Sequence, residues 1–165
     1  MTPHSRMEYL FFARTDCGRV RKNNEDAVAT APEIGLALLA DGMGGYNAGE
    51  VASNMAISIT EHAMARWFAH AGTTPTTSDV RKALQESVQE ANLAVLNTAL
   101  QQLQCAGMGT TLVAAVFVQD RLVLGHMGDS RCYRLRDGQL QQITRDHSWL
   151  QVQMDAGRMT PEEAA

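Results

Sequence analysis

Four carboxylates of this chain stand where a charged side chain is costly. Glu25 and Asp26 precede a short apolar segment. Asp41 follows the apolar run Leu36–Ala40, and Asp129 ends another apolar segment. A buried carboxylate needs a compensating cation, and several that converge would bind a hard divalent ion such as Mg²⁺ or Mn²⁺. Each alone also has a local interpretation, since Asp41 can cap the following helix and Asp129 can start a turn.

A glycine-rich turn, Asp41-Gly42-Met43-Gly44-Gly45, comes directly after the apolar run. Glycines between a strand and a helix let the backbone approach a phosphate or a metal. No Gly-Lys-Ser/Thr follows, and Asn47 occupies the third glycine position of a dinucleotide fingerprint, so a nucleotide-binding α/β domain is disfavoured. An aspartate ahead of the glycines would repel pyrophosphate unless a metal intervened. The turn therefore predicts a cation site first and a phosphate site second.

Two arginines precede these carboxylates. Arg21 can grip a phosphate through two hydrogen bonds of its guanidinium fork, whereas a solvated surface role is the expectation for Arg19. Among the histidines, His126 is expected to be a satisfied core residue because it lies in an apolar segment. His147 follows Asp146, although a helix start at Asp146 or Ser148 explains that stretch equally well. No nucleophile elbow and no catalytic cysteine signature occurs, which disfavours serine or cysteine hydrolysis.

The elements that must position these residues change in type along the chain. Short apolar segments with polar or glycine-containing boundaries predict strands. Asp137-Gly138 suits the type I′ turn of a hairpin. Strands, then two helices, then strands again indicate an α+β domain with antiparallel sheet and a helix pair on one face. The expected strands are Met7–Ala13, Ala27–Thr30, Leu36–Ala40, Thr111–Val118, Leu122–His126, Arg131–Arg136 and Gln139–Ile143.

Two amphipathic helices are predicted from apolar residues that recur at about every fourth position. The first covers roughly residues 48–69, and the second is expected to be capped by Ser78. The expected buried stripes are Val51, Met55, Ile59, Ala63 and Trp67 in the first helix, and Val80, Leu84, Val88, Ala91, Val95 and Ala99 in the second.

Length and composition set the wider limits. The 165 residues, 45% hydrophobic, indicate a single globular domain spanning 1–165. A net charge of −4 without a basic run argues against nucleic-acid binding. No apolar stretch approaches the roughly 20 residues of a membrane span, and the start lacks a secretory signal. The three cysteines suggest neither disulfides nor a zinc site. We therefore expect no membrane association and a cytoplasmic location.

Five ordered motifs of the chain resemble the bacterial branch of the PP2C-type (PPM) metal-dependent serine/threonine protein phosphatases. They cover residues 14–148, and residues 156–164 are similar to the segment that leads into the family's flap. The motifs are Val20-Arg21-Lys22-Asn23-Asn24-Glu25-Asp26, Ala40-Asp41-Gly42-Met43-Gly44-Gly45 with Ala48-Gly49-Glu50, Gly107-Met108-Gly109-Thr110-Thr111, Gly128-Asp129-Ser130-Arg131, and Thr144-Arg145-Asp146-His147-Ser148.

The resemblance implies a β-sandwich of two antiparallel sheets flanked by helix pairs, with two Mg²⁺ or Mn²⁺ ions, and a third in some complete domains, between the sheets. By position, Asp41 would bridge two ions and act as a catalytic residue. The Gly42 carbonyl and Glu25, directly or through water, would serve one of these ions, and Asp26 would hold metal-bound water. The position of Asp129 corresponds to a ligand of the additional ion.

The implied activity is hydrolysis of phosphoserine and phosphothreonine on proteins by a water that two cations activate. Arg21 would be the catalytic arginine that grips the substrate phosphate. Phosphorylated proteins, a bacterial serine/threonine kinase and its substrates are the implied partners. Met43 stands where eukaryotic relatives carry a histidine, so no general acid is assigned. The physiological substrates, the preferred metal and the oligomeric state do not follow from the sequence.

Two features predict that the domain is truncated in the flap region. The family's two later metal aspartates have no counterpart, and Thr160-Pro161-Glu162-Glu163 reads as a helix start with only two residues after it. The alternative function is therefore a non-catalytic phosphatase-like fragment or binding module. An incomplete core should leave apolar faces or sheet edges exposed.

Overall fold

The computed structural model describes residues 8–44, 48–72 and 74–164 of the chain. Its main sheet is antiparallel, with the order β1-β2-β4-β5 and the short β3 also paired to β2. The bounds are β1 Asp26–Ala31, β2 Leu36–Met43, β3 Gly109–Thr110, β4 Leu112–Val118 and β5 Arg121–Met127. Short runs of apolar side chains explain why these segments form strands. The expected strands Ala27–Thr30, Leu36–Ala40, Thr111–Val118 and Leu122–His126 are confirmed.

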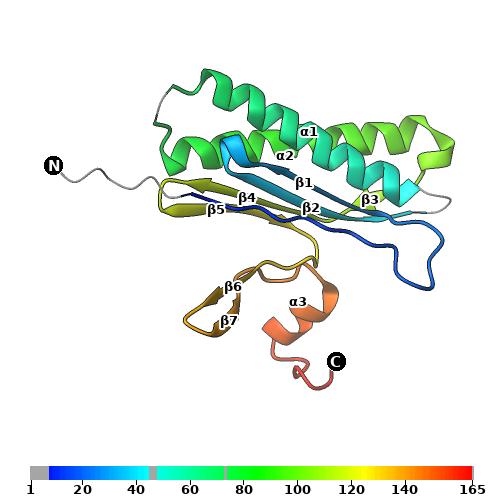
Figure 1. Cartoon of the computed structure of the whole chain (residues 1–165). Coiled ribbons are helices and arrows are strands. Elements are labelled where there is room, and N and C mark those ends of the chain that lie inside the picture. Colours follow the sequence, from blue (N-terminus) through cyan, green and yellow to red (C-terminus); the bar gives the residue numbers. More distant parts are fainter. Residues whose placement is uncertain (1–7, 45–47, 73, 165) are drawn as a thin grey trace.

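Two long helices cover one face of this sheet side by side (Figure 1). They are α1, Ala48–His70, and α2, Thr77–Gln101. Short 3₁₀ turns, Pro32–Ile34 and Leu103–Cys105, lie in the connections. The expected pair of antiparallel helices on one sheet face is therefore confirmed.

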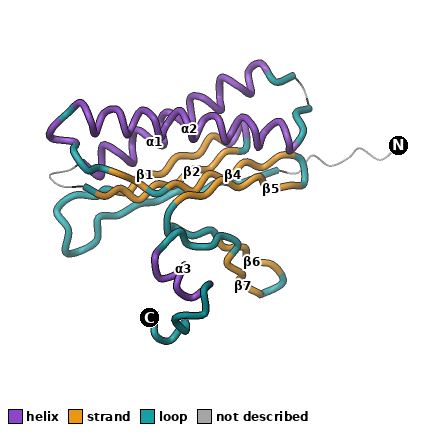
Figure 2. Tube along the Cα trace, turned by 180° about the vertical axis from the view of Figure 1, so that it is seen from behind, coloured by secondary structure: helices purple, strands orange, loops and turns teal. Residues whose placement is uncertain are grey.

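A smaller part of the chain lies on the other side of the sheet from the helices (Figures 1 and 2). It contains the hairpin of β6, Tyr133–Arg136, and β7, Gln139–Gln142, followed by the short helix α3, Trp149–Asp155. Asp137 and Gly138 both have positive φ, 52° and 75°, as the predicted type I′ turn requires. The predicted α+β class with antiparallel sheets is confirmed.

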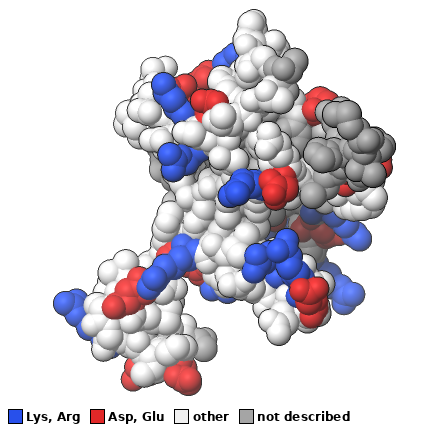
Figure 3. All heavy atoms as spheres, turned by 90° about the vertical axis from the view of Figure 1, so that its left-hand side faces the viewer, with Lys and Arg blue, Asp and Glu red and all other residues white. Residues whose placement is uncertain are grey.

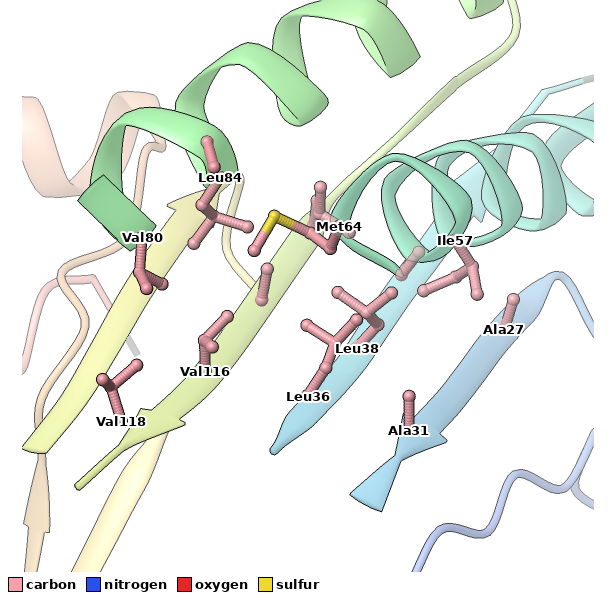
Figure 4. Close-up of a cluster of buried hydrophobic side chains, with 14 residues drawn as sticks. Ala27, Ala31, Leu36, Leu38, Ile57, Met64, Val80, Leu84, Val116 and Val118 are labelled. Carbon is pink, nitrogen blue, oxygen red and sulfur yellow. The ribbon is translucent and has the colours of Figure 1, made fainter. Parts of the chain in front are cut away.

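The core lies between the sheet and the two helices, where Met64 reaches from α1 toward Leu84 of α2 (Figure 4). Burial along β2 alternates, with Leu36, Leu38 and Ala40 buried and Asp41 exposed. Because successive side chains of a strand point to opposite faces, Asp41 belongs to the face that turns away from the helices.

The predicted strand Met7–Ala13 is wrong for residues 8–13, which pair with no strand in the structure; Met7 lies outside the described residues. The segment approaches the sheet through its rings, with Tyr9 and Phe11 centroids 4.6 and 5.9 Å from that of Phe117. Ring contacts do not form the backbone ladder of a strand. Leu10 and Phe12 remain 78% and 92% exposed.

Two helix details also differ from the sequence prediction. Thr76, not Ser78, caps α2, because Thr76 and Asp79 bond each other's backbone amides in a capping box. In α1 the predicted stripe is wrong at Val51, which is 38% exposed, and confirmed at Ala63, which is buried. Met55 and Trp67 pack against the core while partly buried. The buried face consists instead of mostly small residues, which let the helix approach the sheet closely: Ala48, Gly49, Ala52, Ser53, Ala56, Ile57, Thr60, Ala63 and Met64. The α2 stripe is confirmed at Val80, Leu84, Ala91 and Val95.

At the end of the described chain, the predicted capping bonds of the Thr160 segment are present. The Thr160 amide donates to the Glu163 carboxylate at 2.8 Å, and the Glu163 amide donates to Thr160 Oγ1 at 3.3 Å. Residues 161–163 form a single turn.

Candidate metal centre

The ends of β1 and β2 bring Asp26 and Asp41 together. The two aspartates are register partners, and the Gly42 amide donates to the Glu25 carbonyl at 3.0 Å in the next pair along the ladder. Hydrogen-bonded and non-hydrogen-bonded pairs alternate in an antiparallel ladder, so Asp26 and Asp41 form a non-hydrogen-bonded pair, in which side chains come closest. Two acidic side chains are thus held close together at the ends of the two strands.

This arrangement raises the pKa of the Asp41 carboxyl above its ordinary value. Partial loss of solvent at the strand end is the largest cause, although the side chain remains exposed. Asp26 follows, through its charge and by accepting a hydrogen bond from the protonated Asp41 carboxyl, and the charge of Asp129 adds to the effect. The Arg21 guanidinium acts in the opposite direction. All four side chains therefore share one electrostatic environment.

Glycines bring the first turn of α1 against the end of β2. A Cβ on Gly42 would lie 2.0 Å from the Gly49 carbonyl oxygen and 2.7 Å from that of Glu25. A Cβ on Gly49 would lie 2.8 Å from the Glu25 carboxylate. Glycine at both positions therefore allows α1 and β2 to come this close. The contact places the Glu25 side chain beside the Asp41-Gly42 backbone. The alternative of Asp41 as a helix cap involves residues 45–47, which lie outside the described part of the chain.

Arg21 extends from the exposed polar connection that precedes β1. Within the described residues it forms no ion pair, and neither do Arg19 and Lys22. The connection is closed by Asn24, whose amide donates to the Thr15 hydroxyl and whose Oδ1 accepts from the Asp26 amide at 3.1 Å. Arg21 is thus a cation without an ion-pair partner among the described residues, and it lies within electrostatic range of Asp41.

The donor types of this group fit a hard divalent cation. Asp26, Asp41 and Asp129 offer carboxylate oxygens and Gly42 offers a carbonyl, the ligands that Mg²⁺ and Mn²⁺ prefer. The raised pKa of Asp41 shows that negative charge there is undercompensated, which a cation would relieve. In the described ranges, however, no three Asp, Glu, His or Cys side chains form a ready ligand cluster. The structure brings Asp26 and Asp41 into contact and keeps Asp129 within electrostatic range.

The Asp146-His147-Ser148 motif has a structural explanation. Asp146 accepts a bidentate ion pair from Arg131, with Nη2 at 2.7 Å, and these hydrogen bonds hold the pKa of Asp146 below its usual value. Ser148 caps α3 by accepting from the Gln151 amide at 3.2 Å, so Ser148 is the helix start among the two alternatives.

His126 differs from its prediction. Its ring lies 4.6 Å from that of His147, and its buried Nε2 has no hydrogen-bond partner among the described residues. The expectation of a satisfied core histidine is therefore wrong, because that nitrogen has no partner among the described residues and the residue is only half-buried.

Sequence reasoning assigned no role to Thr110 and Thr111, whose hydroxyls contact the Asp41 backbone at 3.0 and 2.9 Å. The available signal was a pair of hydroxyl residues directly before an apolar strand. A cavity of about 180 Å³ lies on the helix side of β3, and none of the candidate carboxylates lines it.

Comparisons with known proteins show the family of this chain. The sequence profile of the family described as Protein phosphatase 2C matches residues 15–157. The chain is 44% identical over 154 residues to the serine/threonine protein phosphatase PstP of Mycobacterium tuberculosis, covering 93% of this chain and 28% of that protein. It is 36% identical over 154 residues to the serine/threonine phosphatase stp of Listeria monocytogenes, covering 92% and 60%.

Among solved structures, the catalytic domain of PstP in complex with two manganese ions superposes with a TM-score of 0.78 at 44% identity, covering 92% of this chain and 61% of that one. The chain thus spans 28% of the M. tuberculosis relative and 60% of the Listeria relative. No helix among the described residues is long and apolar enough to cross a membrane.

Proposed function

The chain belongs to the protein phosphatase 2C family, and from that membership we propose that it supplies the first part of a domain that hydrolyses phosphoserine and phosphothreonine on proteins. Mn²⁺ or Mg²⁺ is the proposed cofactor. The solved PstP catalytic domain, similar over 92% of this chain, is described with two manganese ions. The observation that carries the proposal is the cross-strand pair Asp26–Asp41, whose repulsion a cation would remove.

The proposed roles follow from where each residue lies. Asp41 is the register partner of Asp26 and lies within electrostatic range of Asp129, so its carboxylate is the proposed bridge between ions. Glu25 and the Gly42 carbonyl flank it at the contact with α1. Two bound cations would acidify a water and neutralise the phosphoryl oxygens.

Arg21 is the proposed phosphate-binding residue. Its guanidinium is exposed, free of ion pairs in the described residues, and close enough to Asp41 to influence that carboxyl. A phosphate held by the Arg21 fork would be bound through two hydrogen bonds, which fix its orientation as well as its position. No serine or cysteine nucleophile is required.

Phosphorylated proteins, among them substrates of a bacterial serine/threonine kinase, are the proposed partners, in the cytoplasm. A nucleic acid is not among them. On the face shown in Figure 3, acidic and basic side chains are interspersed among uncharged ones, with no continuous basic surface. Such a surface would be needed to neutralise phosphates along a backbone.

A second function, binding without hydrolysis, is favoured by one observation. The described residues gather no ready cluster of three metal-ligand side chains, and the two later metal aspartates expected from the family resemblance have no counterpart in this sequence. For this chain alone, the alternative is a phosphatase-like module that docks a partner.

An assay of phosphate release separates the phosphatase from the binding module. Its substrates are p-nitrophenyl phosphate and a phosphothreonine peptide, each with millimolar Mn²⁺. We expect hydrolysis that Asp41→Ala abolishes and that Asp120→Asn, an exposed aspartate between β4 and β5, leaves unchanged. If this chain shows no hydrolysis while a version extended by the following coding sequence is active, the result would support the binding function for this chain. Activity that survives Asp41→Ala would contradict the metal mechanism.

A further inference from the structure

The strand beside β2 is interrupted at Thr111. Gly42 pairs with Thr110 of β3, and Leu39 pairs with Val113 of β4. Both pairs follow the same register, so Thr111 lies directly opposite Asp41. The ladder is interrupted between these two stretches, at Ala40 and Asp41 of β2, and the interruption includes the position that faces the central carboxylate of the candidate metal centre.

At this position a side-chain hydroxyl takes the place of a backbone carbonyl as the hydrogen-bond acceptor. In a regular hydrogen-bonded antiparallel pair, the two residues exchange both N–H···O bonds. The Thr111 amide does donate to the Asp41 carbonyl, at 2.9 Å, but the Asp41 amide donates to Thr111 Oγ1, also at 2.9 Å. The Thr111 carbonyl is used elsewhere, accepting from the Thr110 hydroxyl at 2.9 Å.

The same threonine contacts the turn that carries Asp129. Its Oγ1 lies 2.7 Å from the Ser130 hydroxyl, and either oxygen can donate. Its methyl group packs against Gly128, where a Cβ would lie only 2.6 Å from Thr111 Cγ2 and where φ is +95°. The residues on both sides of Asp129 thus rest on Thr111.

From these contacts we infer that Thr111 is a positioning residue, which fixes the Asp41 end of β2 relative to the Asp129 turn through one hydroxyl. Removing the hydroxyl leaves the Asp41 amide without its acceptor and releases Ser130 at the same time. The consequence for metal binding rests on the proposed function, whereas the hydrogen bond to the Asp41 amide does not.

Thr111→Val and Thr111→Ser separate the hydroxyl from the shape of the side chain, since valine keeps the size and serine keeps the oxygen. The matched control is Thr60→Val, the same change at a fully buried threonine of α1 whose hydroxyl has no hydrogen-bond partner in the described part of the chain. Ser130→Ala removes only the second contact and tests the link if Thr111→Val does not fold.

The first measurement is hydrogen exchange of the Asp41 amide, monitored by NMR at a temperature well below the thermal unfolding midpoint. We expect at least about tenfold faster exchange in Thr111→Val, with protection retained in Thr111→Ser, Ser130→Ala and Thr60→Val. Unchanged protection in Thr111→Val, or equal loss in Thr111→Ser, would overturn the inference.

Mn²⁺ affinity, measured by calorimetry on the same proteins, is the second measurement. Loss of an outer-shell partner typically weakens metal binding about 10- to 100-fold, so Thr111→Val should lose affinity in that range. Ser130→Ala should lose less, and Thr111→Ser and Thr60→Val should stay close to wild type. Equal affinity in Thr111→Val and wild type would contradict the positioning role. If the wild-type chain binds no Mn²⁺, the proposed function fails, and the exchange experiment still decides the role of Thr111.

Discussion

Gly42→Ala tests whether the close contact of α1 with β2 shapes the metal centre. The added Cβ would lie 2.0 Å from the Gly49 carbonyl oxygen, 2.5 Å from the Gly49 carbonyl carbon and 2.7 Å from the Glu25 carbonyl oxygen. Real Cβ contacts are essentially never shorter than 3.0 Å, so the helix and the strand must separate by about 1 Å. All three atoms are backbone, and no side-chain rotation can relieve the clash.

The expected loss of stability follows from this displacement. Overpacking a well-packed site costs about 1–3 kcal/mol, occasionally more, and a clash with backbone alone belongs at about 3 kcal/mol. For a chain of this size, that corresponds to a midpoint lowered by roughly 6–12 °C. Because Glu25 and Asp41 flank the contact, Mn²⁺ affinity should fall as well.

Gly109→Ala is the matched control. Gly109 lies on β3, opposite Met43, and its added Cβ would meet only the Met43 side chain, with Cε at 3.3 Å and Cγ at 3.9 Å. That methionine end is flexible and exposed, so we expect a change below about 1 kcal/mol. Urea unfolding followed by circular dichroism, with a Mn²⁺ titration of each folded protein, measures both effects. Equal unfolding midpoints and equal Mn²⁺ affinities for the two variants would refute the reasoning.

Three further predictions follow from single side chains. In metal-free protein, Asp41→Asn should raise the thermal midpoint at pH 7, because a carboxyl whose pKa is raised on folding destabilises the fold above that pKa and has no effect below its unfolded pKa. A thermal-shift series from acid to neutral pH should therefore show the gain disappearing in acid. Arg131→Gln removes the hydrogen bonds that lower the pKa of Asp146, so the wild type should lose more stability than the variant as the pH falls through that lowered pKa; acid unfolding curves that coincide would contradict this. Met64→Ala should cost about 2–5 kcal/mol in urea unfolding because the side chain is fully buried. Met43→Ala, 66% exposed, should cost less than about 0.5 kcal/mol.

Local patterns in the sequence predicted much of the fold. Short apolar runs located β2 and β4, the Asp137-Gly138 pair located the β6–β7 turn, and helical spacing located α2. Residues 8–13 show the limit, since their spacing suits a strand but no neighbouring backbone pairs with them. Whether a segment forms a strand depends on a partner distant in sequence.

The candidate site was predictable in its residues and not in its arrangement. Residue types suggested oxygen ligands, but the closeness of Asp26 to Asp41 depends on which pairs of the ladder are hydrogen-bonded. The contact of Gly42 with Gly49 and the role of Thr111 likewise depend on tertiary packing. The α1 stripe was wrong at Val51 for a similar reason, because small residues pack closest where helix and sheet approach each other.

Calorimetric titration of Mn²⁺ into the purified chain, its Asp41→Ala variant and the Asp120→Asn control tests the central claim most directly, that the carboxylates at the ends of β1, β2 and β5 form a cation site. Saturable binding should occur in the wild type and in Asp120→Asn, and it should be at least about tenfold weaker in Asp41→Ala. Equal Mn²⁺ affinity in all three proteins, or no binding to the wild type, would contradict the claim.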